Sequence, residues 1–318
     1  MSHLNITDAE LKKSATQFRK KLLIMPIIAA EQTLKHMSGR PGVAGREVVG
    51  QLSGTIELGP YDASRVDSNG VTITPRVLET YLGSVVKRFD VNEAAKTVWG
   101  TIVAQGEALK SADLAQQVLA FLSTRLGKGL AGAIWSAKRN DAGTTTKDLF
   151  DGFDTITEQE ITNSKITTSE GNLHEFSAAI TNTNAVDMLQ SFYESAAPEL
   201  QEQKTKLFLP YEVYNAYVKD YAVRFQSSAY NTQYKKTFLE GSNDLCELVP
   251  LASKKGSKFI HLSTSGNMLY GYGAGLADEN ITIEKYHEFL LSFVSTMYFG
   301  TQFESISSEC LLVGKLHD

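Results

Sequence analysis

The chain has little cysteine or histidine for its 318 residues, and each shortage argues against a class of protein. Two cysteines, Cys246 and Cys310, are too few for a disulfide framework, so we expect a reducing compartment and two buried thiols. The six histidines form no H-x-x-x-H pair, and no C-x-x-C occurs. In His174-Glu175 and His287-Glu288 the adjacent side chains point apart. We therefore expect no metal and no cofactor.

Long hydrophobic runs are missing too. The apolar run Leu22–Ala30 has nine residues and is interrupted by Pro26, whereas a membrane helix needs about 20. It follows Arg19-Lys20-Lys21 and could be mistaken for a signal peptide, but the basic region before it is long and contains Asp8 and Glu10. We expect no membrane segment, no secretion and a cytoplasmic context, or a particle assembled there.

Motifs for nucleotide and acyl chemistry are also absent. The chain has no G-x-x-x-x-G-K-[ST] loop and no G-x-S-x-G elbow. Gly271–Gly275 resembles part of a dinucleotide fingerprint, but it lacks the third glycine and the strand–turn–helix setting, so a loop is favoured. Paired carboxylates such as Glu158 and Glu160 are too common on protein surfaces to indicate a catalytic site. Catalytic triads need not be local in sequence, so these absences lower the case for an enzyme without excluding one.

Charge is distributed very unevenly along the chain. Residues 1–46 contain eight Lys or Arg against three Asp or Glu, and the remaining 272 residues contain 23 against 33. Thr7–Glu10 predicts a capping box at the start of a basic amphipathic helix that ends or kinks at Pro26. A basic arm on an acidic body suits contact with an acidic neighbour or with nucleic acid. The sequence leaves both open.

The stretch after this arm looks extended. Residues 38–54 hold five glycines and a proline, which predicts a flexible connector. Residues 51–90 contain β-branched and aromatic residues in partial alternation around the turn-rich Asp62–Gly70, which predicts a two-stranded extended loop. That loop has too few apolar residues to build a core, so we expect it either to move freely or to lie on a partner.

The strongest predicted helix is Ser111–Ala137. Apolar residues recur there every four positions, so their stripe drifts around the helix and its two ends face different neighbours. Gly127, Gly129 and Gly132 lie inside it, each costing about 1 kcal/mol relative to alanine, and predict a bend or a close contact. The apolar positions are Leu114, Val118, Leu122, Leu126, Leu130 and Ile134.

Helices and short strands alternate irregularly in the rest of the chain, which indicates an α+β fold without a βαβ repeat. Helices are expected at 184–197 and from Tyr211 to about Arg224, the latter with Tyr214, Tyr217, Val218 and Tyr221 on one face. Strands are expected at 207–210, 245–251, 258–264, 268–272, 280–303 and 309–316.

The order of these parts resembles the major capsid proteins of tailed bacteriophages, which have the Hong Kong 97-type fold. Local similarity lies in Glu57–Asp62 with Val71–Leu78, in Leu149–Phe153 after the long helix, and in Lys206–Tyr214. The closing stretches 267–275 and 281–302 add to it.

The resemblance implies a domain organisation and a function. Residues 1–50 would be the N-terminal arm, 51–90 the extended loop, 91–149 a peripheral domain with spine helix 111–137, 150–280 the axial domain, and 281–318 strands returning to the peripheral domain. The protein would be structural and not an enzyme, and copies would assemble into hexamers and pentamers of an icosahedral virion shell around double-stranded DNA, built in the host cytoplasm. Partners would be other copies, DNA by non-specific contact, and portal, scaffolding or decoration proteins. Lys–Asn crosslinking, known in some members, is not carried over, because Lys87 and Asn69 lie only at the end and the turn of the loop.

Arm and loop residues are the expected contacts between subunits. Deleting residues 55–88 should then leave a folded subunit that does not assemble. The candidates are Phe18, Arg19, Lys20, Arg40, Arg46, Glu57, Tyr61, Arg65 and Arg76, with Gly127, Gly129 and Gly132 as bend candidates in the spine helix.

Two other functions remain open. An encapsulin-like shell would use the same architecture around enzyme cargo, and the contents of purified particles would distinguish it from a capsid. A monomeric α+β enzyme would show no rings or shells by electron microscopy.

Overall fold

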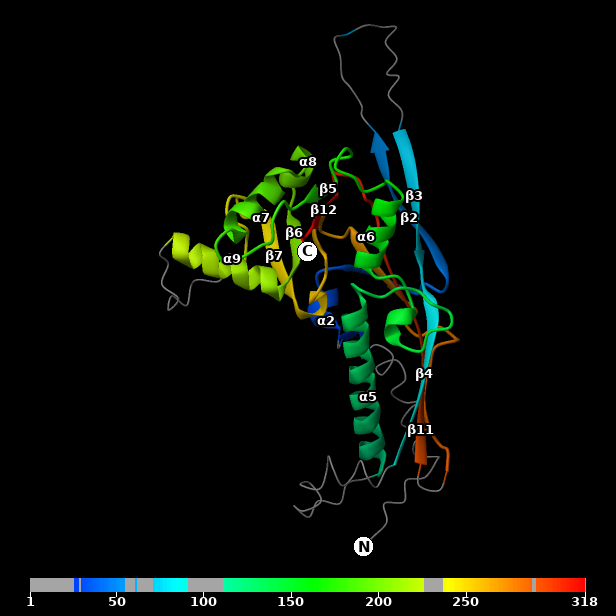
Figure 1. Cartoon of the computed structure of the whole chain (residues 1–318). Helices are drawn as coiled ribbons and strands as arrows, with labels where there is room; N and C mark the ends of the chain where they lie inside the picture. Colours follow the sequence, from blue (N-terminus) through cyan, green and yellow to red (C-terminus); the bar gives the residue numbers. More distant parts are fainter. Residues whose placement is uncertain are drawn as a thin grey trace.

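The computed structural model describes residues 26–28, 30–54, 61, 71–90, 111–225, 237–287 and 290–317. Within these residues the strands form two five-stranded sheets and a separate two-stranded ribbon (Figure 1). The predicted α+β class is confirmed. The elements are α2 (Glu31–Leu34), β1 (Ser38–Pro41), β2 (Arg46–Gly54), β3 (Val71–Glu79), β4 (Tyr81–Asp90), α5 (Ser111–Ala133), η1 (Thr146–Asp148), α6 (Phe153–Thr162), β5 (Leu173–Glu175), α7 (Ala185–Glu194), α8 (Pro198–Gln201), β6 (Thr205–Pro210), α9 (Tyr211–Arg224), β7 (Cys246–Leu251), η2 (Ala252–Lys254), β8 (Phe259–Thr264), β9 (Met268–Tyr272), β10 (Asn280–Lys285), β11 (Leu290–Phe303) and β12 (Leu311–Lys315).

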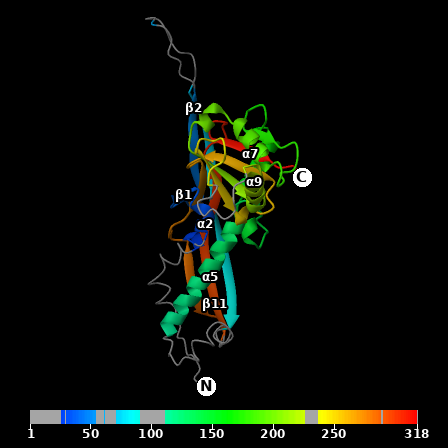
Figure 2. The same ribbon diagram turned by 90° about the vertical axis from the view of Figure 1, so that its left-hand side faces the viewer.

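The first sheet is organised around the long strand β11. One edge of β11 pairs antiparallel with β4 in ten registered pairs, and its other neighbours are β10 and β9, with β1 added parallel to β9. Figure 2 shows α5 crossing obliquely over these long strands. Leu130 of α5 and Phe299 of β11 belong to one buried cluster, so the helix covers the inner face of this sheet.

The second sheet has the order β5-β12-β8-β6-β7 and is buried on both faces. Successive residues of β6 point to opposite faces: Leu207 and Leu209 pack with α7 and α9, whereas Phe208 belongs to the cluster around Trp135. Double burial explains why these strands appear as short continuous apolar runs in the sequence.

The ribbon is formed by β2 and β3, which pair antiparallel in nine registered pairs. It projects beyond both sheets (Figures 1 and 2). Strands β3 and β4 are separated only by Thr80, which is buried and donates to the Val43 carbonyl oxygen at 3.0 Å. The extended stretch predicted for 51–90 is therefore two structures: the β2–β3 ribbon, and β4 inside the first sheet.

Several sequence-based boundaries need correction. Residues 38–54 are not a flexible connector, because β1 and β2 lie there, and Gly39 is packed so closely that an added Cβ would stand 2.7 Å from the Tyr270 hydroxyl. Residues 280–303 form the hairpin β10–β11 instead of one strand. The long helix ends at Ala133 instead of Ala137, where the Ile134 and Trp135 carbonyl oxygens accept N–H bonds from Phe153 and Asp154.

The two sheets divide the chain differently from the expected domain boundaries. Strand β9, expected with residues 150–280 in the axial domain, pairs with β11 in the first sheet. Strand β12 was expected to return with residues 281–318 to the region of the long helix, but it lies between β5 and β8 in the second sheet. Of the described part of that segment, β10 and β11 join the first sheet, whereas β12 is buried inside the second sheet with a strand on each edge.

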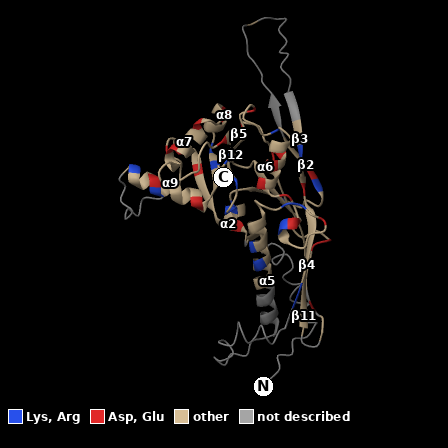
Figure 3. Cartoon of the chain, in the orientation of Figure 1, with Lys and Arg blue, Asp and Glu red and all other residues tan. Residues whose placement is uncertain are grey.

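Along the described body, Lys and Arg positions are interspersed with Asp and Glu positions (Figure 3). Of the basic segment 1–46, residues 1–25 and 29 lie outside the described part, including the predicted N-terminal helix and its capping box.

Candidate assembly surfaces

The ribbon exposes apolar side chains on one of its faces. Val48 and Val77 face each other across β2 and β3, and Val48 is 74% exposed. The opposite side is anchored at the base, where Val49 and Leu78 pack on Leu269 of the first sheet. An isolated two-stranded hairpin is marginally stable in water. Contact with another molecule would therefore bury the exposed face of this ribbon and stabilise it.

A polar network holds the base of the ribbon. Arg76 of β3 donates from Nη2 to Glu160 Oε1 at 2.7 Å and to Gln302 Oε1 at 2.9 Å, and from Nε to the Phe303 carbonyl oxygen at 3.1 Å. Gln302 Nε2 in turn donates to the Val77 carbonyl oxygen at 3.0 Å. These bonds join the ribbon to α6 and β11 and fix where it leaves the body.

The expected contact residues separate into groups. Arg76 is bound within its own subunit, so its guanidinium is not presented to a neighbour as the sequence predicted. Arg46 is exposed and ion-paired with Glu79, and Arg40 lies at the surface 3.8 Å from Glu304. Tyr61 is exposed. Phe18, Arg19, Lys20, Glu57 and Arg65 lie outside the described residues.

The three helix glycines have different surroundings. Gly127 is buried, and a Cβ at Gly129 would lie 3.4 Å from Thr146 Oγ1. A Cβ at Gly132 would meet nothing within 4 Å, so no close contact explains that glycine. A bend at these residues stays a prediction.

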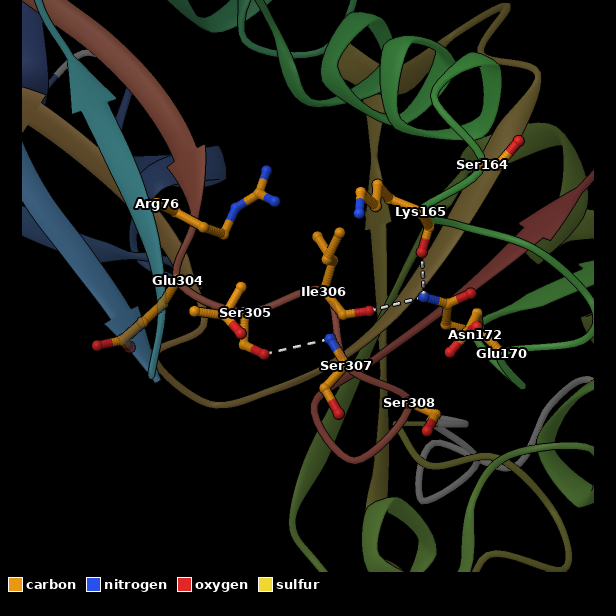
Figure 4. Close-up of a pocket in the computed structure, with 11 residues that line it drawn as sticks. Arg76, Ser164, Lys165, Glu170, Asn172, Glu304, Ser305, Ile306, Ser307 and Ser308 are labelled. Atoms are coloured by element: carbon orange, nitrogen blue, oxygen red, sulfur yellow. Dashed lines mark hydrogen bonds between the residues drawn. The ribbon is translucent and has the colours of Figure 1, made fainter. Parts of the chain in front are cut away.

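A pocket of about 350 Å³ lies beside the ribbon base (Figure 4). Its walls come from β3, the α6–β5 connection and the β11–β12 connection. Asn172 Nδ2 ties these connections together by donating to the carbonyl oxygens of Lys165 at 3.0 Å and Ile306 at 2.8 Å. The lining contains no histidine or cysteine. The hydrogen bonds of Asn172 connect the α6–β5 segment to the β11–β12 segment. The lining residues are Thr74, Arg76, Ser164, Lys165, Glu170, Asn172, Glu304, Ser305, Ile306, Ser307 and Ser308.

A buried charge cluster, which the sequence did not reveal, joins α6 to the second sheet. Lys254 Nζ lies 2.9 Å from Asp154 Oδ1, 3.1 Å from His261 Nδ1 and 3.8 Å from the centre of the Trp135 ring. Burial lowers the pKa of Lys254, against the pull of Asp154, and burial with the nearby Lys254 charge holds the pKa of His261 well below its ordinary value. His261 is therefore neutral: Nδ1 accepts from Lys254, and Nε2 donates to Thr157 Oγ1 at 2.9 Å.

The Lys254 cluster is a structural joint. The Lys254 side chain has no exposed surface, and its ammonium also donates to Ser257 Oγ at 3.0 Å. A lysine in a Lys-Lys-Gly turn ordinarily predicts a surface position, so the sequence pattern gave no signal of this burial.

The remaining sequence candidates are also used structurally. Gly273 makes room for Glu279, whose Oε1 would lie 2.3 Å from a Cβ at that position, and Glu279 Oε2 accepts from the Gly275 N–H at 2.6 Å. Gly271 and Tyr272 end strand β9, and residues 273–275 form the expected loop, which here lies against a buried carboxylate. Cys246 is buried, which raises the pKa of its thiol to about 12, whereas Cys310 is half-buried.

The described part of the chain shows neither a metal centre nor a membrane helix. No group of three or more His, Cys, Asp or Glu side chains there is placed to hold a metal ion. No helix in the same part is long and apolar enough to cross a bilayer.

The sequence matches no protein-family model and no curated protein, whereas many solved structures share the fold. The cyanophage A-1(L) capsid subunit superposes with a TM-score of 0.56 at 12% identity, over 92% of both chains. The satellite phage P4 procapsid subunit gives 0.55 at 10% identity, over 91% of this chain and 96% of that one. The capsid of the native GTA particle gives 0.52 at 9% identity, over 91% and 90%. Because the likeness extends over nine-tenths of each chain, the protein has the Hong Kong 97-type fold seen in phage capsids.

Proposed function

We propose that this protein is a structural shell subunit, the major capsid protein of a tailed bacteriophage, and not an enzyme. The observation that carries the proposal is the ribbon, a nine-pair hairpin that is anchored at its base by Val49 and Leu78 and exposes Val48 and Val77 on the opposite face. A capsid fold over nine-tenths of the chain gives that ribbon a role, because shell subunits stabilise one another by contacts between copies.

In this proposal the first sheet with α5 is the peripheral domain, and the second sheet with α7 and α9 is the axial domain. Copies assemble into hexamers and pentamers that close into an icosahedral shell around double-stranded DNA. Assembly takes place in the host cytoplasm, with the basic arm of residues 1–46 available to DNA or to an acidic neighbour. Portal, scaffolding and decoration proteins complete the virion.

The test shortens the ribbon and keeps its anchor. Deletion of 55–88 is unsuitable, because it removes β4, a strand of the first sheet. Replacing residues 52–73 by a two-residue Asn-Gly turn retains Val49, Arg76 and Leu78. We expect the shortened chain to keep the thermal unfolding midpoint of the full chain but to stay unassembled in negative-stain electron microscopy and sedimentation.

Two results would contradict the proposal. Closed particles from the shortened chain would remove the ribbon from assembly. A full-length chain that forms neither rings nor shells at any concentration would favour a monomeric enzyme. The contents of particles from infected cells decide between a genome capsid and a shell for protein cargo.

A further inference from the structure

Helix α9 carries an aromatic stripe that the fold of its own chain uses only in part. Five large side chains follow one another at spacings of three, four, three and four residues. At about 100° per residue they occupy a sector of about 80° on the helix. We call this set the α9 seam: Tyr211, Tyr214, Val218, Tyr221 and Phe225.

The α9 seam lies beside the face by which α9 packs on its own domain. That inner face consists of Val213, Ala216, Tyr217 and Asp220, all buried. At the two ends of the seam, Tyr211 and Phe225 remain 45% and 53% exposed, and the three side chains between them are half-buried.

The seam is held rigidly by contacts with α7. Asp220 Oδ2 accepts from the Val186 N–H at 2.8 Å, and Arg224 joins Asp220 to Asp187 and to the Thr183 carbonyl oxygen. The Tyr221 and Phe225 rings lie 4.4 Å apart between centroids. A surface fixed in this way loses little conformational entropy when a partner binds.

We propose that the α9 seam docks on a second copy of this chain. The inference rests on the proposed function and extends it by naming a contact inside the axial part of the shell. A three–four spacing of apolar side chains is the pattern by which helices pack along one another.

Charge and position favour another copy over other occupants. On the side away from the buried face, the α9 residues next to the seam are Ala222 and Asn215, both uncharged, and α9 as a whole carries residues of both signs (Figure 3). Such a surface has no net attraction for nucleic acid or for the basic arm, but it complements a surface like itself. Helix α9 ends on the side of the body away from β4 and the ribbon (Figure 1). One copy can therefore contact two neighbours at once, as a ring requires.

The experiment exploits the helix geometry. The double variant Tyr211→Ser, Phe225→Ser removes the two exposed rings of the seam and leaves the buried face intact. Val223→Ser is the matched control, because Val223 is 77% exposed on α9 but lies well outside the seam sector. We expect the double variant to need at least about tenfold higher concentration to assemble, measured by sedimentation velocity, and the control to assemble like the unmodified chain.

Failure of the seam and failure of the proposed function give different results. If the double variant assembles at the ordinary concentration, or the control is equally impaired, the seam proposal is wrong while the shell function stands. If the unmodified chain never assembles, the shell function fails and the seam proposal fails with it.

A second measurement does not depend on the stability of the double variant. Benzoylphenylalanine in place of Phe225 is photoactivated in a mixture of isotope-labelled and unlabelled copies. We expect crosslinked peptides that join labelled to unlabelled chains. Crosslinks confined to single chains would show that the chain's own residues occupy the seam, and would overturn the proposal.

Discussion

Arg76 Nη2 lies 2.7 Å from Glu160 Oε1, and this ion pair attaches the ribbon to α6. Both side chains are largely buried, at 11% and 19% exposure. Removing one member of such a pair leaves a charge in a poorly solvated site, which typically costs about 3 kcal/mol or more. We therefore expect Arg76→Met to lower the free energy of unfolding by about 2–3 kcal/mol and to raise amide exchange in β2 and β3.

The matched control for that variant is Arg46→Met. Arg46 sits on the partner strand of the ribbon and pairs with Glu79, but its side chain is almost fully solvated. Exposed pairs contribute at most about 1 kcal/mol, so this variant should unfold nearly as the unmodified chain does. Equal losses from both substitutions would show that the ribbon base is not specifically held by Arg76.

One buried histidine, His261, and two half-buried ones, His36 and His174, make stability depend on pH. Burial lowers the pKa of His261, His36 and His174 below the ordinary 6.5. As the pH falls below about 6.5, the unfolded chain takes up protons that the folded chain does not, so the free energy of unfolding falls. Each such histidine contributes up to about 1.4 kcal/mol per pH unit until its folded pKa is reached.

His261→Gln isolates the largest of these contributions. The variant should be less stable near neutral pH, because Lys254 loses its imidazole acceptor. Its free energy of unfolding should nevertheless fall less steeply than that of the unmodified chain between neutral pH and about one unit below the ordinary histidine pKa of 6.5. Urea midpoints at the two pH values measure this difference. Exposed His287→Gln is the control. An unchanged slope in the His261 variant would contradict the assignment.

The elements best predicted from sequence are those in which the spacing of apolar residues matches the face that is buried. Helix α9 and strands β6 to β9 appear close to their expected positions, because each has one apolar face or an uninterrupted apolar run. The body of α5 was found for the same reason, but its end was not. That end depends on Phe153 and Asp154, which lie nineteen positions further along the chain and donate to the carbonyl oxygens of Ile134 and Trp135 just after the helix.

What sequence reasoning missed depends on partners remote in the chain. Gly39 lies in a strand only because Tyr270 and its neighbours offer a parallel edge. Lys254 is buried because Asp154 and His261 receive its ammonium there. The ribbon was expected as a surface for neighbours, yet Arg76 at its base bonds within the chain, because Glu160 and Gln302 come together beside it.

Gly300 shows how tightly β11 meets the junction of β3 and β4. A Cβ at this position would lie 1.9 Å from the Glu79 carbonyl oxygen, so backbone and not a flexible side chain would have to move. We expect Gly300→Ala to lower the free energy of unfolding by about 3 kcal/mol, which denaturant titration would measure. Stability within a few tenths of a kcal/mol of the unmodified chain would show that the junction can relax.

The substitution Gly132→Ala tests whether Gly132 is needed for a bend in α5 and not for the stability of the subunit. An alanine Cβ at this exposed helical position would meet nothing within 4 Å, so the substitution should stabilise the subunit by up to about 1 kcal/mol. If Gly132 permits a bend that assembly requires, the same variant should form fewer closed particles in negative-stain microscopy despite its higher unfolding midpoint. Higher stability with unimpaired particles would remove Gly132 as a bend residue, because nothing else near it restricts a side chain.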